Sequence, residues 1–310
     1  MTNHDQDGND TWRAKRVKVA LIDTGVRLQD EVIRGEKARF TGRSWVDQDQ
    51  TDYDDSCGHG THLARLLLKV TSTADILVAK VSRDKNFTAA SIPHITQAIR
   101  WAISQQANII SLSLGFQVEI PEIKEALAEA TRPQDPNRSP VIVFAAAANW
   151  ANKTQVAFPA SEPDVICISA LDGYGIAVGN NPEPLPTKRI ATLGAAIASA
   201  WDGRPVWLHG TSFAAPIAAG IAANVLEFAK QKMDASDWEW RNLSSFRGMQ
   251  DVLKLMCVRS GQFSFLAPWR IADKGLHTAG DIAQAIREVL SLGYPVYVAY
   301  NRRKETVYVD

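Results

Sequence analysis

The chain has 310 residues, of which 45% are hydrophobic and 22% are charged, a composition typical of globular proteins. Its 34 Lys and Arg residues balance its 34 Asp and Glu residues, so the formal net charge is zero. This balance argues against a protein that binds nucleic acid or anionic membranes through a general positive charge. The composition also excludes collagen, coiled coils and intrinsic disorder.

The cysteine content and the first residues of the chain indicate in which cellular compartment the protein is expected to act. Three cysteines, an odd and sparse number, indicate free thiols in a reducing environment. Residues 1–10 are polar and acidic and lack the apolar segment of a signal peptide. No uninterrupted apolar run approaches the ~18 residues of a membrane span. We therefore expect a cytoplasmic, intracellular protein with neither membrane nor nucleic-acid partners.

Apolar runs alternate with segments of helical periodicity after a polar N-terminal tail at residues 1–15. In chain order, the predicted strands are Val17–Ile22, Ile76–Val81, Ile109–Leu114, Val141–Ala147 and Val165–Ala170. The predicted helices are Thr61–Val70, Ser91–Gln106, Pro121–Ala130 and Thr211–Ala229. Because the strands are apolar throughout, helices must cover both faces of the sheet. The pattern predicts an α/β fold, a three-layer sandwich with a mostly parallel central sheet.

The chain divides into a predicted core and a predicted extension. Residues 16–233 form the core, and residues 234–310 form a C-terminal extension packed on it. The extension contains helical patterns near residues 248–257 and 279–291 and ends in an apolar, strand-like segment, Tyr294–Tyr300.

Three short segments carry residues whose combination points to nucleophilic catalysis. Asp23 follows a buried strand, His59 stands at the start of a predicted helix, and Ser212 stands at the start of another. A serine hydroxyl becomes a nucleophile through an adjacent base, and that base needs a third group to orient it. In α/β folds such residues gather at the carboxyl ends of the strands. The start of the Ser212 helix also supplies N–H groups for a developing oxyanion.

The three segments resemble those of the subtilisin-like serine peptidases, the subtilases of the peptidase S8 type. The order acid, His and Ser is that of the family, and the resemblance covers about residues 16–232. The matching segments are Asp23-Thr24-Gly25, Gly58-His59-Gly60-Thr61-His62-Leu63-Ala64 and Gly210-Thr211-Ser212-Phe213-Ala214-Ala215-Pro216. The last has Phe213 where the family commonly has Met.

The resemblance implies a serine endopeptidase that acts through an acyl-enzyme and needs no cofactor for its chemistry. Ser212 would attack the peptide carbonyl, His59 would transfer the proton, and Asp23 would orient the imidazole. Asn149 resembles the residue that holds the oxyanion together with the Ser212 backbone N–H. The residue before it, Ala148, is normally Gly in the family.

The resemblance also implies how the substrate is bound. Ser113, Leu114 and Gly115 resemble the segment that pairs with the substrate backbone. Trp150 directly follows Asn149 and is expected to wall the pocket for the residue before the cut bond, which favours a small to medium side chain. The other edge of the family's substrate cleft is glycine-rich, whereas Lys85-Asn86-Phe87 stands here. That departure argues against broad specificity.

Other residues leave alternatives open. The acidic run Asp47–Asp55 is either a solvated loop that favours basic substrate side chains or part of a site for a structural calcium ion, whose ligands are unknown. His62 is expected to be a structural hydrogen-bonding residue, since no Glu or third ligand completes a zinc site. Cys57 is either a reactive thiol near the site or a small buried filler.

Two functional classes are consistent with these residues. The first is an intracellular serine endopeptidase that cleaves protein or peptide substrates, either folding without a pro-domain or forming one domain of a larger protein with regulatory domains or partners. The alternative is a catalytically idle, subtilisin-like domain that binds peptides through the same cleft.

Overall fold

The computed structural model describes residues 16–148, 155–178 and 181–299. Its strands are β1 (Lys18–Asp23), β2 (Phe40–Ser44), β3 (Asp75–Lys80), β4 (Ile109–Leu112), β5 (Ile142–Ala146), β6 (Val165–Leu171), β7 (Ile190–Leu193), β8 (Ile197–Trp201), β9 (Arg204–Leu208), β10 (Cys257–Ser260) and β11 (Phe263–Leu266). Its α-helices are α1 (His59–Val70), α2 (Ile92–Ser104), α3 (Pro121–Thr131), α4 (Thr211–Gln231), α5 (Asp237–Leu243), α6 (Phe246–Leu255) and α7 (Ala279–Leu292). Short 3₁₀-helices span Arg34–Arg39, Ala89–Ser91 and Pro268–Lys274.

Nine of the described strands form one sheet in the order β10-β11-β7-β6-β5-β4-β1-β3-β2, and β8 and β9 form a separate hairpin. All neighbours in the large sheet are parallel except β10 and β11. Ile22 of β1 is aligned with Ala79 of β3 and Leu112 of β4, so these strands end at one level. The predicted mostly parallel sheet is confirmed.

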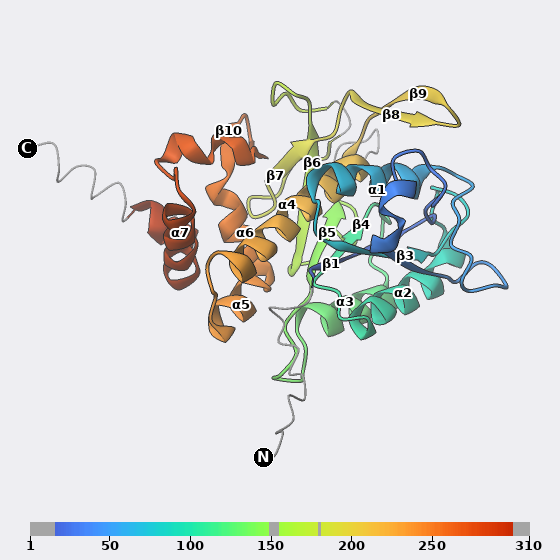
Figure 1. Ribbon diagram of the computed structural model, residues 1–310, viewed down its shortest axis with the longest axis horizontal. Coiled ribbons are helices and arrows are strands. Elements are labelled where there is room, and N and C mark those ends of the chain that lie inside the picture. Colours follow the sequence, from blue (N-terminus) through green and yellow to red (C-terminus); the bar gives the residue numbers. More distant parts are fainter. Residues whose placement is uncertain (1–15, 149–154, 179–180, 300–310) are drawn as a thin grey trace, which may run out of the picture.

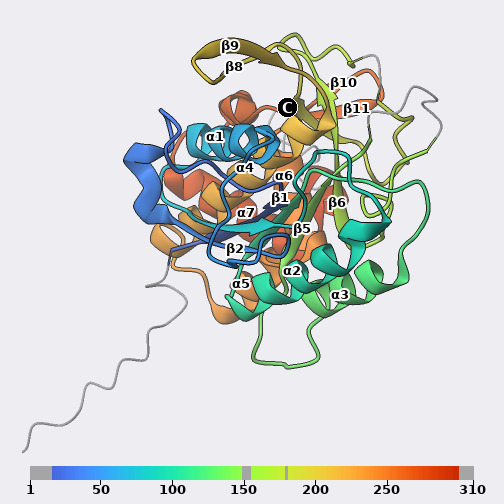
Figure 2. The ribbon, with the colours of Figure 1, turned by 90° about the vertical axis from the view of Figure 1, so that its right-hand side faces the viewer.

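Helices cover both faces of the sheet, which explains the continuous apolar runs. In β1, Val19 and Leu21 belong to the hydrophobic cluster under α1 and α4, whereas Ala20 and Ile22 belong to the cluster under α2 and α3. Figures 1 and 2 show α1 and α4 on one side of the sheet and α2 and α3 on the other. The predicted three-layer α/β sandwich is confirmed.

Helix α4 is long and apolar enough to cross a membrane by length and composition, and it is the one such helix among the described residues. However, 72% of its most apolar window is buried inside the fold. It packs against α1 and against strands of the sheet, as a core helix does.

The C-terminal residues continue the same sheet and the same core. Strand β11 pairs in parallel with β7, and residues of α5, α6 and α7 join the hydrophobic cluster that contains α1 and α4. Figure 1 shows these three helices beside α4. The sheet and its core therefore extend past the predicted boundary at residue 233.

The expected strand at Tyr294–Tyr300 is wrong. The structure is helical at residues 294–299, directly after the Gly293 that ends α7. Tyr294 and Tyr297, three residues apart, both pack against the cluster under α4, a spacing that places them on one side of a helix. Packing on a neighbouring helical layer therefore outweighs the strand preference of an aromatic and β-branched run.

Candidate active site

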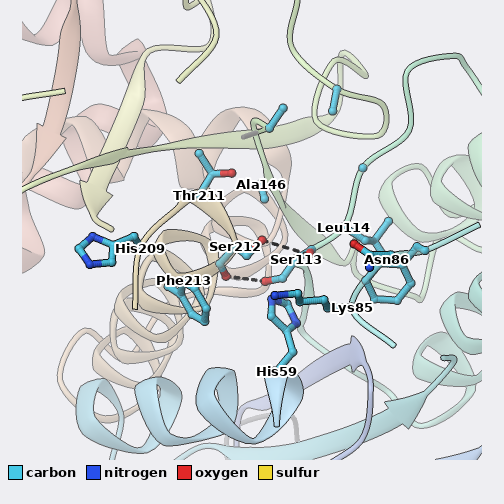
Figure 3. A pocket seen from close by; sticks show the side chains of 14 residues that line it. His59, Lys85, Asn86, Ser113, Leu114, Ala146, His209, Thr211, Ser212 and Phe213 are labelled. Carbon is cyan, nitrogen blue, oxygen red and sulfur yellow. Dashed lines mark hydrogen bonds between the residues drawn. The ribbon is translucent and has the colours of Figure 1, made fainter. Parts of the chain in front are cut away.

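The predicted site residues stand where strands and helices meet. Asp23 is the last residue of β1, His59 is the first residue of α1, and Ser212 lies in the first turn of α4. His59 and Ser212 line one cavity of about 470 Å³ (Figure 3). Its described lining residues are His59, Lys85, Asn86, Phe87, Ser113, Leu114, Gly115, Ala146, Ala148, Ala157, His209, Thr211, Ser212 and Phe213. The cavity is at the carboxyl edge of the sheet, the usual position of sites in such folds.

Asp23 and His59 form a buried hydrogen-bonded pair. The Nδ1 of His59 lies 2.7 Å from Oδ1 of Asp23, and their side chains are 9% and 1% exposed. Because an ionised carboxylate only accepts hydrogen bonds, Nδ1 is the donor, which leaves Nε2 as the acceptor in a neutral imidazole. The Thr24 N–H also donates to Oδ1 of Asp23, at 2.8 Å.

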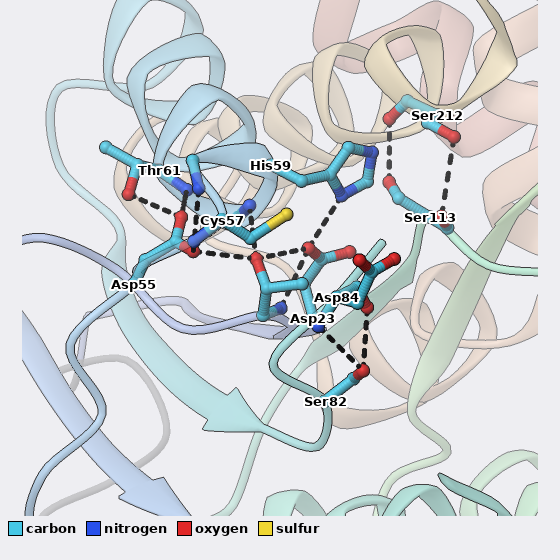
Figure 4. A network of polar contacts seen from close by, with 12 residues as sticks. Asp23, Asp55, Cys57, His59, Thr61, Ser82, Asp84, Ser113 and Ser212 are labelled. Atoms are coloured by element: carbon cyan, nitrogen blue, oxygen red, sulfur yellow. Dashed lines mark hydrogen bonds and ion pairs between the residues drawn. The ribbon is translucent and has the colours of Figure 1, made fainter. Parts of the chain in front are cut away.

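The surroundings of His59 change the affinity of its imidazole for a proton. Burial lowers the pKa of His59, but the negative charge of Asp23 and its hydrogen bond raise it by more, so that the pKa lies above the ordinary value for histidine. Figure 4 shows one ring nitrogen directed to Asp23 and the other facing Ser212. This arrangement can accept a proton from a hydroxyl and stabilise the cation that results.

Ser212 is held against Ser113 at the bottom of the cavity. The Ser113 hydroxyl donates to the carbonyl oxygen of Ser212 at 2.7 Å, and the Ser212 hydroxyl lies 3.4 Å from the carbonyl oxygen of Ser113 (Figure 4). In this conformation the described hydrogen bond of the Ser212 hydroxyl is therefore to Ser113 rather than to His59. A serine hydroxyl turns about a single bond between staggered positions, so this contact with Ser113 is one of several orientations open to it.

The start of α4 carries positive character. Gly210, the N-cap, provides no side chain to pair with the N–H groups of the first turn. Unpaired N–H groups and the helix dipole together favour an anion at this position. The ring of Phe213 lies 5.5 Å from the imidazole of His59, measured between ring centroids, so the residue that replaces the common Met packs on the candidate base.

Sequence reasoning missed the role of Asp55, which organises the start of the His59 helix. Its carboxylate is fully buried and accepts from the hydroxyl of Thr24 at 3.0 Å and from the N–H groups of Cys57 and Gly58, both at 2.9 Å. It also accepts from the N–H and the hydroxyl of Thr61, at 2.9 and 2.7 Å (Figure 4). The signal was an Asp four residues before the helix start at His59, where the first N–H groups of a helix need an acceptor.

The glycine after His59 permits a close approach of two backbone segments. A Cβ on Gly60 would lie 2.2 Å from the carbonyl oxygen of Gly25. The Gly60 N–H donates to the Thr24 hydroxyl at 2.9 Å, and that hydroxyl in turn donates to Asp55. The segment that follows Asp23 and the helix that begins with His59 are thus joined by a continuous set of buried hydrogen bonds.

Removing the Asp55 carboxylate is expected to destabilise the fold strongly. In Asp55→Ala, the donors of Thr24, Cys57, Gly58 and Thr61 lose a buried acceptor, and we expect the free energy of unfolding to fall by about 3–5 kcal/mol. Chemical denaturation followed by circular dichroism measures this loss. The matched control is Asp54→Ala, because Asp54 is exposed, and it should change the free energy by less than about 0.5 kcal/mol. Equal stability of the two variants would contradict this role.

The structure describes most of the predicted substrate-binding residues. Ser113, Leu114 and Gly115 follow β4 and line the cavity. Lys85, Asn86 and Phe87, which lie between β3 and α2, line it too. The predicted strand Ile109–Leu114 ends at Leu112, because the residues after it leave the sheet. Asn149 and Trp150 lie outside the described residues.

Ala148, which precedes Asn149, has a backbone conformation that favours glycine. Its φ is 143°, and it lies in the cavity wall with only 9% of its surface exposed. Residues with a Cβ are strained at such φ values, at a cost of order 1–3 kcal/mol. The departure from the family's Gly therefore stores strain directly beside the candidate oxyanion residue.

Ala148→Gly is expected to raise the free energy of unfolding by about 1 kcal/mol, since glycine adopts a positive φ without strain. The matched control is Ala147→Gly, because Ala147 is the neighbouring buried alanine but is not among the residues with positive φ. The same substitution there should lower the free energy by about 1 kcal/mol. Thermal denaturation of both variants measures the difference, and a destabilised Ala148→Gly would show that the strain is absent.

The acidic run Asp47–Asp55 does not form part of the described cavity wall. Asp47 lies 2.8 Å from both Lys80 and Arg83; although burial raises its pKa, the hydrogen bonds from these two cations lower it to about 2. The structure therefore gives no support to the idea that this run attracts basic substrate side chains. Over residues 16–148, 155–178 and 181–299, no group of three or more His, Cys, Asp or Glu side chains could hold a metal ion.

His62 has the structural contact expected of it. Its Nδ1 lies 2.9 Å from the hydroxyl of Ser199 in the β8–β9 hairpin, and its ring packs 5.8 Å from that of Trp201. Cys57 is half-buried, and the two alternatives for its thiol stay predictions.

Comparison with known proteins identifies the family and agrees with the fold. Residues 14–255 match the Subtilase family, Peptidase S8. The subtilisin-like protease het-Q2 of Podospora anserina is 32% identical over 203 residues, which make up 57% of this chain and 51% of that protein. The intracellular serine protease of Paenibacillus polymyxa is 28% identical over 241 residues, 72% of this chain and 70% of that protein. The match therefore spans only about half the length of the fungal relative.

Solved structures share the fold at low sequence identity. The prenylagaramide maturation protease PagA superposes with a TM-score of 0.63 at 20% identity, over 83% of this chain and 93% of that one. A lanthipeptide protease superposes with a TM-score of 0.66 at 17% identity, over 84% and 87% of the two chains. Because the family match covers well over half of the sequence and the architecture agrees, the chain belongs to the subtilase family.

Proposed function

We propose that the chain is a serine endopeptidase that hydrolyses peptide bonds through an acyl-enzyme formed on Ser212. The observation that carries this proposal is the 2.7 Å hydrogen bond between Asp23 and His59 at a cavity that Ser212 also lines. An oriented imidazole beside a serine at a helix start is the arrangement that activates a hydroxyl. Membership of the subtilase family supports the same assignment.

The proposed reaction has two steps. Nε2 of His59 takes the proton of the Ser212 hydroxyl as its oxygen bonds to the substrate carbonyl carbon. The resulting imidazolium, stabilised by Asp23, gives that proton to the leaving amine, and the C–N bond breaks. Water then attacks the acyl-enzyme by the same proton transfers in reverse order. The Ser212 N–H and Asn149 are the proposed donors to the oxyanion, and no metal or cofactor is assigned a step.

The substrate backbone is proposed to lie along Ser113, Leu114 and Gly115, with Trp150 beside the side chain that precedes the cut bond. The cavity lining supports the first part of this assignment, because these three residues and Ser212 line the same space. Residues 16–233 are proposed as the peptidase core and residues 234–310 as an extension packed on it, which adds β10 and β11 to the same sheet. Intracellular action is also proposed, supported by the similarity to the intracellular serine protease of Paenibacillus polymyxa and by three cysteines free of disulfides.

A serine-directed fluorophosphonate probe tests this proposal. The wild-type chain should be labelled once and should cleave members of a peptide library, whereas Ser212→Ala should do neither. Binding of library peptides without labelling or cleavage would instead favour the idle peptide-binding domain. Labelling together with hydrolysis of esters but not of peptides would favour a different acyl hydrolase.

A further inference from the structure

The described wall of the catalytic cavity carries positive charge without a compensating carboxylate. Of its described lining residues, Lys85 is the one with a permanent charge, and His59 and His209 are the two that gain a positive charge on protonation. No Asp or Glu occurs among them. A concave site lined by one sign of charge concentrates ligands of the opposite sign.

Lys85 forms no ion pair with any carboxylate in the part of the chain that the structure describes, and its side chain is exposed. The neighbouring charged side chains on its loop make their described contacts with groups other than Lys85. Arg83 pairs with Asp47 at 2.8 Å, and Oδ1 of Asp84 accepts from the N–H of Asn86 at 2.7 Å. An ammonium group with no partner of its own is available to a ligand.

The carboxylates behind the cavity are buried and hydrogen-bonded within the protein, so they do not face a ligand. Asp23 bonds to His59, and Asp55 is surrounded by backbone N–H and threonine hydroxyl donors. Figure 3 shows Lys85 beside His59, and its charge lowers the pKa of the imidazole, although the effect of Asp23 is larger. A substrate that reaches His59 and Ser212 therefore passes close to Lys85.

We propose that Lys85 is a specificity-determining residue that selects peptides with an acidic side chain close to the cut bond. The inference rests on the proposed endopeptidase function and names its substrate class. The acidic side chain lies on the stretch of peptide held between Lys85–Phe87 and Ser113–Gly115, where Asn86 offers a further neutral hydrogen-bond donor. This is opposite in sign to the preference that the acidic run Asp47–Asp55 suggested.

Matched peptides test the proposal. A positional library first gives the cleavage site, and three peptides that differ only in Glu, Gln or Lys at the selected position are then compared. For the wild type, kcat/KM for the Glu peptide should exceed that for the Gln peptide about 3- to 5-fold and that for the Lys peptide about tenfold. The ratios should shrink between 0.05 and about 0.5 M salt, because salt screens partly exposed charges.

Reversing the charge distinguishes Lys85 from the rest of the cavity. In Lys85→Glu the Lys peptide should become the best of the three, and in Lys85→Gln the ratios should approach one. The matched control is Lys232→Glu, because Lys232 is exposed at the far end of α4, about 30 Å from Ser212 by helical rise. Lys232→Glu should rank the three peptides in the same order as the wild type does.

Two negative outcomes are distinguishable. If the wild type reacts with the fluorophosphonate probe and cleaves peptides, but the three peptides rank equally or Lys85→Glu keeps the wild-type ranking, the inference about Lys85 is overturned alone. If neither labelling nor cleavage occurs, the proposed function is overturned and this inference with it.

Discussion

Ser212→Ala is expected to lower kcat by about 10⁶-fold while KM for the same peptide changes little. The substitution removes the oxygen that would form the acyl bond but leaves the segments that bind the peptide in place. His59 and Asp23 are then unable to act as a unit, because the imidazole has no hydroxyl to deprotonate. Steady-state kinetics on one library-derived peptide measures the loss, with circular dichroism and thermal denaturation to establish that the variant is folded.

A serine outside the site provides the control for this experiment. Ser72 is exposed and follows the end of α1, so that Ser72→Ala makes the same chemical change about 18 Å along the helix from His59. Its kcat should stay within about twofold of the wild type. If Ser212→Ala kept more than about a tenth of the wild-type kcat, another group would have to be the nucleophile, and the assigned mechanism would be wrong.

The sheet could be predicted from sequence because its strands are buried on both faces. Alternate residues of β1 enter the two hydrophobic clusters on opposite sides of the sheet, so each position had to be apolar. The placement of the three candidate residues at one edge of the sheet could be predicted from the same pattern, whereas their roles rest on the family resemblance. Asp23 directly ends such a run, and His59 and Ser212 begin helices, so one edge of the sheet collects all three.

The β8–β9 hairpin was missed because its residues give no such signal. Most of β9 is exposed or half-buried, and the hairpin is stabilised by packing against a helix far away in the sequence. Ile197 and Leu208 cluster with Leu66 of α1, and the guanidinium of Arg27 lies 3.9 Å from the ring centre of Trp201. Contacts between such distant segments are not encoded in the periodicity of either one.

The role of Asp55 was missed because composition treats all the acidic residues of a run alike. Within Asp47–Asp55, Asp52 and Asp54 are exposed, whereas Asp55 is buried among hydrogen-bond donors. The difference comes from the helix that begins four residues later, whose N–H groups need an acceptor. Counting charges shows that the loop is acidic. Which of its carboxylates is buried depends on the position of the helix start.

Asp23→Asn is expected to lower kcat by about 10⁴-fold and to move the pH dependence of kcat/KM to lower pH. An amide carries no charge to stabilise the imidazolium, and it can donate to Nδ1, which favours the wrong tautomer of His59. In the wild type the raised pKa of His59 places the half-maximal activity above the pH at which an ordinary histidine titrates. Without the Asp23 charge, the burial that lowers this pKa becomes dominant.

The raised pKa of His59 also determines how the stability of the protein depends on pH. A histidine whose pKa is raised on folding contributes stability that is fully present below the unfolded-state pKa and is lost as pH rises through the folded-state pKa. Asp23→Asn should remove this contribution, so its stability relative to the wild type should be poorest on the acidic side of the His59 titration. Denaturation at several pH values and imidazole NMR titration measure the two effects together.

Removing a negative charge elsewhere tests whether the shift in the pH midpoint is specific to the Asp23–His59 pair. Asp52 is exposed in the acidic run, and Asp52→Asn removes one negative charge while keeping an oxygen for the N–H of Asp54. Its kinetic pH midpoint should equal that of the wild type. If Asp23→Asn kept the wild-type midpoint as well, the Asp23 charge would not control the proton affinity of His59. The 2.7 Å contact would then be structural rather than part of the proton transfer.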